Sequence, residues 1–198
     1  MPKRAFDLLV AALGLLLLSP LLVVLALIVK LESPGPVLFH QQRTGKDGVA
    51  FTIYKFRTLQ GKQDAASPGP VPQVADFKEY VFNPLHGGKA YTRIGRFLRS
   101  TSLDELPNLF NVLRGELSIV GPRPEVPELV AQYPPEYLRR HSVRPGITGL
   151  AQISGRSSLT YHETMVYDLD YVDRHPFTRD IAILLRTVPA VLSRRGAG

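Results

Sequence analysis

The sequence predicts a mainly helical α+β protein whose N-terminal helix lies in a membrane, and three observations support this fold class. An almost unbroken apolar segment runs from Phe6 to Val29. Two short runs of strand-forming residues follow it, on either side of a glycine-rich turn, and several short segments with apolar residues at helical spacing come after them. The 198 residues leave room for one well-packed domain. We therefore expect a membrane helix over residues 1–30 and a single domain over residues 31–198.

The apolar segment is long enough to cross a bilayer. As a helix it measures roughly 36 Å at about 1.5 Å per residue, against a hydrocarbon core of about 30 Å. However, Ser19-Pro20 falls at its middle, and basic residues flank both ends, Lys3 and Arg4 before it and Lys30 after it. A helix bent at the proline could enter the membrane and return to the same side. The residues leave a single-pass anchor and a re-entrant helix open; a cleaved signal peptide is not expected, because no small-residue cleavage site follows.

The next two segments predict a β-hairpin. Val37–Arg43 and Val49–Phe56 alternate in the manner of strands around the turn Gly45-Lys46-Asp47-Gly48. Residues 60–90 are rich in proline and glycine, so we expect a loop or lid there, with a short helix near Phe77 to Phe82.

The rest of the chain predicts short amphipathic helices at the membrane surface. Their expected ranges are Ile94–Arg99, a helix that Gly115 ends, Val126–Gln132, Pro135–His141, a helix opened by a Thr160–Glu163 capping box, and Phe177–Arg195 with a kink at Pro189.

The stretch from Arg99 to Pro124 contains the most distinctive pattern of the sequence. An adjacent Asp104-Glu105 pair opens a short helix whose apolar residues fall at i, i+3, i+4 and i+7. Ser102 and Glu105 also spell a capping box, although Pro107 favours a helix that starts at Asp104. In both cases the free N–H groups and the dipole at a helix start favour ionised carboxylates, which suit a nucleophile or a metal ligand.

Arginines in rigid or glycine-rich turns are candidate anion ligands. Arg123 lies between two prolines in Gly121-Pro122-Arg123-Pro124, so it loses little entropy on binding. The loop 144–149 and Gly155-Arg156 offer a candidate diphosphate cradle with Arg144 and Arg156.

The amino-acid composition limits the classes of partner that the protein could bind and the kinds of site that it could contain. The net charge is +7, with a pI near 9.8, which favours nucleic acid, anionic lipid or a phosphorylated substrate. The chain has no cysteine, which excludes disulfides and thiolate metal sites. Neither a Walker A loop nor a dinucleotide fingerprint occurs.

Residues 102–124, SLDELPNLFNVLRGELSIVGPRP, resemble the signature of the bacterial sugar transferases, the monotopic phosphoglycosyl transferases. The resemblance extends over most of the chain outside residues 60–90. It includes Lys3-Arg4-x-x-Asp7, Ser33-Pro34-Gly35-Pro36, Tyr54-Lys55-Phe56-Arg57-Thr58, Arg144-Pro145-Gly146-Ile147-Thr148-Gly149-Leu150 and Gly155-Arg156.

The resemblance implies a location and an activity. The N-terminal helix would be re-entrant, bent at Ser19 and Pro20, and the remaining domain would be catalytic, on the cytoplasmic face of a bacterial inner membrane. The enzyme would move a sugar-1-phosphate from a UDP-sugar to polyprenyl (undecaprenyl) phosphate and release UMP, as a membrane step of glycoconjugate assembly. Its partners would then be these two substrates and the lipid bilayer, with no nucleic acid.

The same resemblance suggests roles for individual residues. Asp104 would be the nucleophile of a covalent aspartyl-phosphosugar intermediate, with Glu105 assisting at the metal or with a proton. A carboxylate that approaches a diphosphate is repelled, so we expect Mg²⁺ held by Asp104 and Glu105. The expected substrate and phosphate ligands are Lys55, Arg57, Arg99, Arg123, Arg144, Arg156 and Asp168.

Two other functions remain open from the residues. A basic, membrane-tethered binding module would bind polyanions without chemistry. A lipid phosphate hydrolase would use the same acid pair with water as the acceptor.

Overall fold

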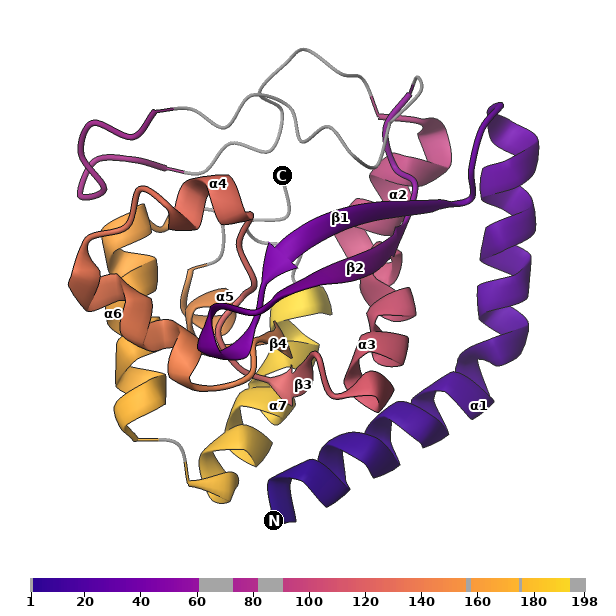
Figure 1. Ribbon diagram of the computed structural model, residues 1–198. Coiled ribbons are helices and arrows are strands. Elements are labelled where there is room, and N and C mark those ends of the chain that lie inside the picture. Colours follow the sequence, from indigo (N-terminus) through magenta and orange to yellow (C-terminus); the bar gives the residue numbers. More distant parts are fainter. Residues whose placement is uncertain (1, 61–72, 82–90, 156–157, 175, 193–198) are drawn as a thin grey trace.

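The computed structural model describes residues 2–60, 73–81, 91–155, 158–174 and 176–192, and within these ranges the chain is mainly helical with two small sheets (Figure 1). The predicted α+β class is therefore confirmed. Of the segment 60–90, the middle part is described; it forms a turn at residues 77–79 rather than the start of the helix predicted there.

With η marking a 3-10 helix, the elements in chain order are α1 (Pro2–Glu32), β1 (Leu38–Thr44), η1 (Lys46–Gly48), β2 (Ala50–Phe56), α2 (Arg93–Thr101), η2 (Leu103–Asn108), α3 (Leu109–Arg114), β3 (Ser118–Val120), α4 (Pro127–Val130), η3 (Pro135–Ser142), β4 (Gly146–Thr148), α5 (Leu150–Ser154), α6 (Tyr161–Asp173) and α7 (Phe177–Leu192).

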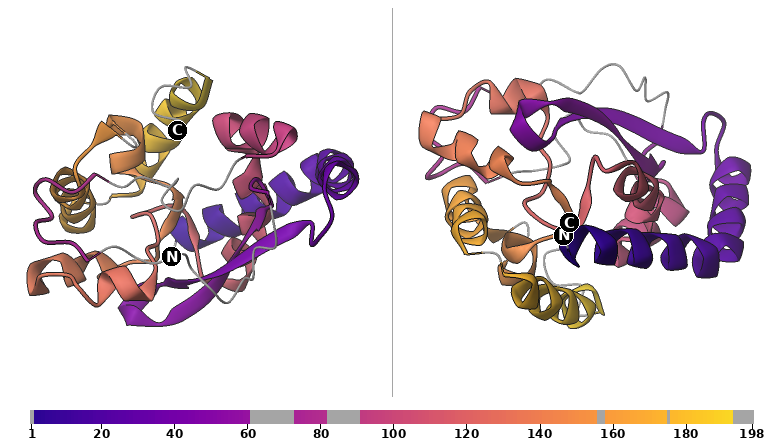
Figure 2. Two further views of the ribbon diagram at one scale, coloured as in Figure 1. Left: turned by 90° about the horizontal axis from the view of Figure 1, so that it is seen from above. Right: turned by 60° about the horizontal axis from the view of Figure 1, so that its bottom comes forward.

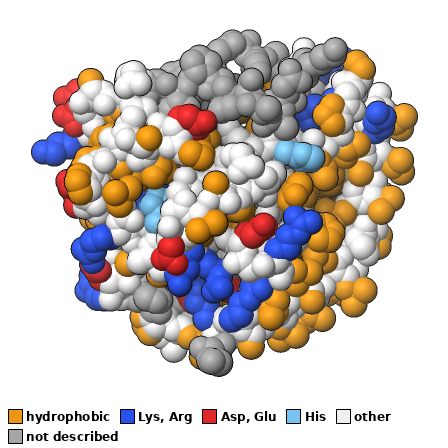
Figure 3. Space-filling model, in the orientation of Figure 1, with side chains coloured by type: hydrophobic (Ala, Val, Ile, Leu, Met, Phe, Trp, Pro, Cys, Tyr) orange, Lys and Arg blue, Asp and Glu red, His pale blue; other side chains and the backbone are white. Residues whose placement is uncertain are grey.

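Helix α1 is a candidate membrane anchor. Among the described residues it is the one helix long and apolar enough to cross a membrane by length and composition. Figure 1 draws it as two arms that meet at an angle, and both views of Figure 2 place its second arm at the outer edge of the molecule. Its exposed leucines and valines cover the right-hand side of Figure 3. Most of its apolar surface therefore has no partner within the described chain.

The Ser19-Pro20 pair explains how α1 continues through a proline. Pro20 has no N–H, so it cannot donate to the carbonyl of Leu16, four residues earlier. The hydroxyl of Ser19 donates to that same carbonyl at 2.8 Å. The serine thus replaces the hydrogen bond that the proline removes, which matters most where no water is present.

The N-terminal end of α1 is bound to the domain by its three charged residues. Lys3 donates to the carboxylate of Asp180 in α7 at 2.8 Å. Arg4 donates to two of the last carbonyls of α3, at 2.7 and 3.1 Å. Asp7, 2% exposed, accepts from the hydroxyl of Ser118 in β3 at 2.9 Å. The motif Lys-Arg-x-x-Asp therefore attaches α1 to three separate elements.

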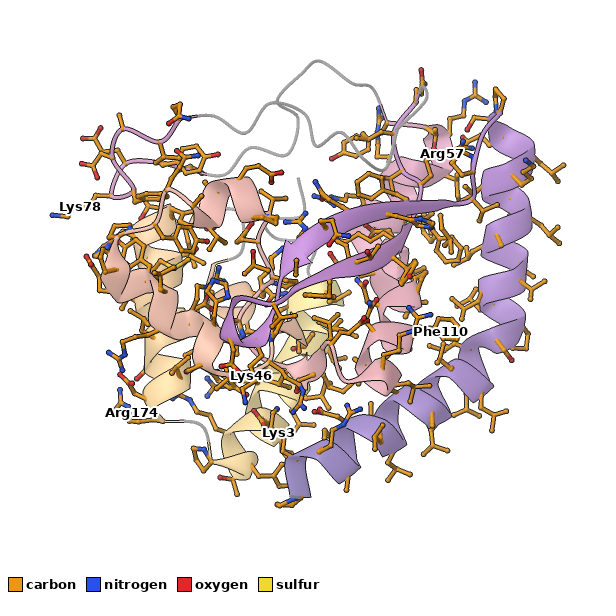
Figure 4. All side chains as sticks on the ribbon, in the orientation of Figure 1. Lys3, Lys46, Arg57, Lys78, Phe110 and Arg174 are labelled. Carbon is orange, nitrogen blue, oxygen red and sulfur yellow. The ribbon has the colours of Figure 1, made fainter. Side chains whose placement is uncertain are left out.

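The C-terminal end of α1 is held by one arginine. Arg57, 2% exposed, donates to the carbonyls of Val29, Ser33 and Pro34 at 3.3, 2.7 and 2.8 Å. Figure 4 shows Arg57 beside this end of the helix and Lys3 near the other end. Because the last carbonyls of a helix lack N–H partners within it, the guanidinium stabilises the helix end. Both ends of α1 are consequently bound to the same domain.

The predicted β-hairpin is confirmed. Strands β1 and β2 pair antiparallel, with Phe39 opposite Lys55 and Arg43 opposite Phe51. The other edge of β2 is paired by side chains rather than by a strand. Asn108 accepts from the backbone N–H of Tyr54 at 3.1 Å, and Asn111 of α3 donates to a β2 carbonyl at 2.6 Å. These asparagines hold the acid-pair segment against the hairpin.

The second sheet joins the two glycine-containing loops. Strands β3 and β4 pair in parallel, and beyond them the N–H of Gly121 donates to Thr148 at 2.9 Å. A Cβ on Gly146 would lie 2.1 Å from the nitrogen of Gly121. These glycines therefore allow one backbone to approach another, whereas the sequence had suggested an approach to a ligand.

Three hydrophobic clusters surround this framework. One joins α1, the hairpin, α3, β3, α6 and α7; the second is mainly aromatic and lies between α6 and the segments 74–80 and 126–137; the third joins the second arm of α1 to β2 and α2. The helices predicted at 94–99, 126–132, 135–141, 160 onward and 177 onward are all present, the last with Pro189 inside it.

Candidate active site

The acid pair lies in a 3-10 helix that follows directly on α2. Ser102 ends α2 in the left-handed region, with φ 57°, and its side chain makes no capping hydrogen bond. The capping-box interpretation of Ser102 and Glu105 is therefore wrong, because a residue in that conformation cannot direct its hydroxyl to the N–H groups of the next helix. The two carboxylates are left to other partners.

Glu105 is bound by two cations. Its Oε1 lies 2.6 Å from Nζ of Lys55 and 2.9 Å from a guanidinium nitrogen of Arg123. Burial opposes ionisation, but the two positive charges outweigh it and hold the pKa of Glu105 well below its usual range. Glu105 is therefore ionised and fixed in place at neutral pH.

Asp104 is buried without such partners. It is 2% exposed, and its nearest cation is Arg99 of α2, whose guanidinium lies 3.7 Å from Oδ2. No hydrogen-bond donor from the described residues reaches its carboxylate. Burial first, and then the charge of Glu105, raise the pKa of Asp104. This direction is opposite to the one predicted from a helix start, because burial is the larger effect here.

A hollow opens beside Glu105, with about 280 Å³ of space when the open solvent in front of it is included; Asp104 does not line it. Three cations and Glu105 line it, so its charge favours an anion. Burial lowers the pKa of Lys55 to about 8 despite the attraction of Glu105. The lining residues are Arg43, Ile53, Lys55, Glu105, Asn108, Leu117, Arg123, Pro124, Gly146 and Ile147.

Arg43 is a pocket residue that the sequence reasoning missed. It donates to the side chain of Gln41 at 2.6 Å and lies 3.4 Å from a carboxylate oxygen of Glu125. The hairpin register places Arg43 on the same face as Lys55, since partners and alternate residues share a face. Strand alternation combined with the turn position could therefore have identified it.

The structure brings five predicted residues together and leaves three described ones elsewhere. The residues brought together at the site are Lys55, Arg99, Asp104, Glu105 and Arg123. Arg57 is engaged at the end of α1, and Arg144 is exposed and donates to the carbonyl of Gly115 at 2.8 Å. Asp168, 1% exposed, is paired with Arg140 at 2.5 Å. Arg156 lies outside the described residues. Phosphate binding by these four residues stays a prediction.

The site has a limited set of ligands for a metal. Within the described residues no cluster of three or more histidine, cysteine or carboxylate side chains occurs. Magnesium needs only one or two carboxylates when substrate phosphates and water complete its octahedron. The carboxylate of Asp104, whose nearest cation is Arg99 at 3.7 Å, fits that requirement, whereas Oε1 of Glu105 is already bound to two cations.

The chain is similar to a known family and to several known proteins. The family profile described as "Bacterial sugar transferase" matches residues 1–194. A UDP-glucose:undecaprenyl-phosphate glucose-1-phosphate transferase of Caulobacter vibrioides is 42% identical over 203 aligned residues, which cover 98% of this chain and 71% of that protein. The exopolysaccharide production protein ExoY of Rhizobium meliloti is 38% identical; the aligned residues cover all of this chain and 88% of that protein.

A longer relative shows that this unit also occurs as part of larger proteins. A UDP-glucose:undecaprenyl-phosphate glucose-1-phosphate transferase of Escherichia coli is 41% identical over 94% of this chain, which spans 39% of that protein. The match of the family profile along nearly the whole chain shows that the protein belongs to the bacterial sugar transferase family.

Proposed function

We propose that the protein transfers a sugar-1-phosphate from a UDP-sugar to undecaprenyl phosphate and releases UMP. The names of its relatives supply the substrate classes. The observation that carries the proposal for this chain is the contrast within the acid pair. Asp104 is buried with Arg99 at 3.7 Å as its nearest cation, while its neighbour Glu105 is fixed by two closer cations that line an anion-favouring hollow.

The contrast fits a two-step transfer through a covalent intermediate. In the first step a carboxylate oxygen of Asp104 attacks the β-phosphorus of the UDP-sugar; the bond from that phosphorus to the bridging oxygen breaks, and UMP leaves with the electron pair. In the second step an oxygen of undecaprenyl phosphate attacks the same phosphorus. The Asp104 carboxylate is regenerated, and the product is an undecaprenyl diphosphate sugar.

Cations of the site have a clear task in both steps. Lys55, Arg99 and Arg123 neutralise phosphate oxygens, so that the Asp104 carboxylate can approach the diphosphate. Arg43 adds a third positive charge at the hollow, which Lys55 and Arg123 also line. We include Mg²⁺ in the proposal, bound by Asp104 together with substrate oxygens; when bound, it would supply further charge neutralisation at the phosphates.

The test of this proposal follows products and the enzyme together. Protein in nanodiscs is incubated with Mg²⁺ and a panel of UDP-sugars, with and without undecaprenyl phosphate. We expect UMP release that continues only with the lipid, and a stoichiometric adduct on Asp104 by mass spectrometry when the lipid is absent. Continuous release of sugar phosphate without lipid would identify a hydrolase, and salt-sensitive polyanion binding without UMP would identify a binding module.

We also propose that α1 is re-entrant, with both ends on the cytoplasmic face of the membrane. Support comes from the attachment of both its ends to one domain, through Lys3, Arg4 and Asp7 at the start and through Arg57 at the end. A helix that crossed the bilayer would place these ends on opposite sides. Apolar side chains of α2 and α3 beside α1 are also exposed, which suits a domain that rests on lipid; they are Phe97, Phe110 and Leu113.

Cysteine labelling can test this topology because the chain has no native cysteine. Single cysteines are placed in N- and C-terminal extensions and treated in intact cells with a membrane-impermeant maleimide. We expect neither site to react before the cells are opened and both to react afterwards. Labelling of only one end in intact cells would refute re-entry.

A further inference from the structure

Arg123 is bound through its backbone as well as through its side chain. Its guanidinium donates to Glu105 at 2.9 Å and lines the hollow. Its backbone carbonyl accepts a hydrogen bond from Nη2 of Arg140 at 2.6 Å. Arg123 stands between Pro122 and Pro124, with no regular secondary structure around it. The turn is held at Pro122 by the N–H of Gly146, which donates to the Pro122 carbonyl at 2.9 Å, and at Arg123 by this contact with Arg140.

Arg140 is itself part of a fully buried network. The nitrogen that donates to Arg123 also donates to Oδ2 of Asp168 in α6 at 2.5 Å. The other terminal nitrogen donates to the hydroxyl of Tyr133 at 3.0 Å, which in turn lies 2.5 Å from the hydroxyl of Tyr161. Arg140 and Asp168 are 2% and 1% exposed, so neither can reach a substrate in the hollow.

A buried ion pair of this kind is a poor way to gain stability. The loss of hydration of two charges often exceeds their attraction, and apolar replacements of similar volume are frequently as stable. The presence of this ion pair is better explained by its effect on the position of a neighbouring residue. Its one contact on the side of the site is the carbonyl of Arg123.

We propose that Arg140 and Asp168 are positioning residues for Arg123, and that they place its guanidinium for the diphosphate of the donor. Asp168 orients Arg140, Arg140 fixes the Arg123 carbonyl, and the Arg123 side chain reaches the site from that fixed point. The proposal rests on the phosphate-binding role of Arg123 in the proposed function. It gives Asp168 an indirect role in place of the direct substrate contact predicted from the sequence.

A substitution that frees the Arg123 carbonyl should lower the rate strongly, although the substituted residue does not itself contact substrate. A displacement of about 1 Å in a catalytic group can cost on the order of a hundredfold in rate. We expect Asp168→Asn to lower kcat/KM for UMP release by roughly 10- to 100-fold. Tyr133→Phe removes one contact of Arg140 and leaves the ion pair, so its effect should be several-fold and in the same direction.

A double-mutant cycle with Arg123→Ala distinguishes positioning from a general structural role. Two quantities are measured for each variant in nanodiscs: kcat/KM for UMP release, and the affinity for inorganic pyrophosphate by calorimetry. If Asp168 acts through Arg123, Asp168→Asn should lower both quantities in the wild-type background and change them less than twofold in the Arg123→Ala background. The cycle is repeated with Tyr133→Phe in case Asp168→Asn does not fold.

Asp180→Asn is the matched control. Asp180 is equally buried and is also paired with a cation, Lys3 of α1; it further accepts from the hydroxyl of Tyr171 in α6 at 2.6 Å, and none of these contacts is to Arg123. Its effects should be the same in both backgrounds. Equal losses from Asp168→Asn with and without Arg123, or no effect of Arg123→Ala on pyrophosphate, would overturn the positioning proposal. Absence of UMP release by wild type would refute the proposed function, and the pyrophosphate cycle would still decide the role of Asp168.

Discussion

Replacement of Lys55 by arginine should change the pH dependence of the first half-reaction. Lys55 contacts Glu105 at 2.6 Å, and burial lowers its pKa to about 8. The lysine is therefore charged below about pH 8 and loses its charge above it. An arginine at this position stays charged throughout this range, since its pKa exceeds about 12.

The magnitude follows from the charged fraction of Lys55. About half of the lysine is protonated at pH 8 and about one-eleventh at pH 9. If the charged form alone binds the diphosphate, kcat/KM of the wild type should fall about fivefold between these two values and about tenfold for each further unit. The Lys55→Arg variant should show no fall in this interval, even if its rate at pH 7 is lower.

The assay is single-turnover UMP release in nanodiscs, without undecaprenyl phosphate, so that titration of the acceptor phosphate does not contribute. Lys46→Arg is the matched control, because Lys46 is exposed on the hairpin turn, and it should retain the wild-type profile. A descending limb near pH 8 that persists in Lys55→Arg, or a flat wild-type profile up to pH 9.5, would refute the assignment of this titration to Lys55.

Three further outcomes test other parts of the structure. Asp104→Asn should reduce turnover by at least roughly a thousandfold and abolish the mass-spectrometric adduct, because an amide cannot serve as the nucleophile; turnover near wild type would exclude the covalent step. Arg57→Met should lower the free energy of unfolding by about 2–4 kcal/mol in a denaturant titration, because it leaves the carbonyl of Val29 in α1, and those of Ser33 and Pro34 just after it, without this donor; a raised KM at unchanged stability would instead support the predicted phosphate contact. Gly146→Ala should cost at least about 2 kcal/mol, since its Cβ would lie 2.1 Å from a backbone nitrogen, whereas Gly48→Ala, at positive φ with open space around it, should cost only about 1 kcal/mol. Equal losses at the two glycines would show that conformation, not the contact between the loops, decides their cost.

Local patterns predicted the elements better than they predicted their partners. The hairpin could be predicted because strand alternation and the turn 45–48 are both short-range features. The Thr160–Glu163 capping box was predicted and is present, with both of its hydrogen bonds. The similar Ser-x-x-Glu pattern at Ser102–Glu105 forms no capping box, because Ser102 ends α2 in the left-handed conformation. The sequence pattern is the same in both cases, and the preceding helix decides the outcome.

From the residues alone, the proximity of two charged side chains could be predicted only for neighbours in the sequence. Asp104 and Glu105 are adjacent in sequence, so their proximity was certain. By contrast, Asp168 is paired with Arg140, and Arg57 with Val29 at the end of α1, each over a separation of 28 residues that no periodicity encodes. Both arginines satisfy carbonyls, a use of arginine that leaves no pattern in a single sequence.

The two adjacent carboxylates have environments that push their pKa values in opposite directions, and this separates their roles. Glu105 is ionised and its Oε1 is bound to both Lys55 and Arg123, so attack on phosphorus by that oxygen would first require the loss of two short charged contacts. Asp104 has no such contacts to lose, and a raised pKa makes its carboxylate the more basic of the pair. A more basic oxygen is the better nucleophile once ionised. The positive charges of the site, or Mg²⁺ bound at the substrate phosphates, would favour that ionised form. The negative charge of Glu105 holds Lys55 and Arg123 at the hollow. In the proposed mechanism, Glu105 would therefore orient two of the cations that Asp104 needs when it attacks the donor.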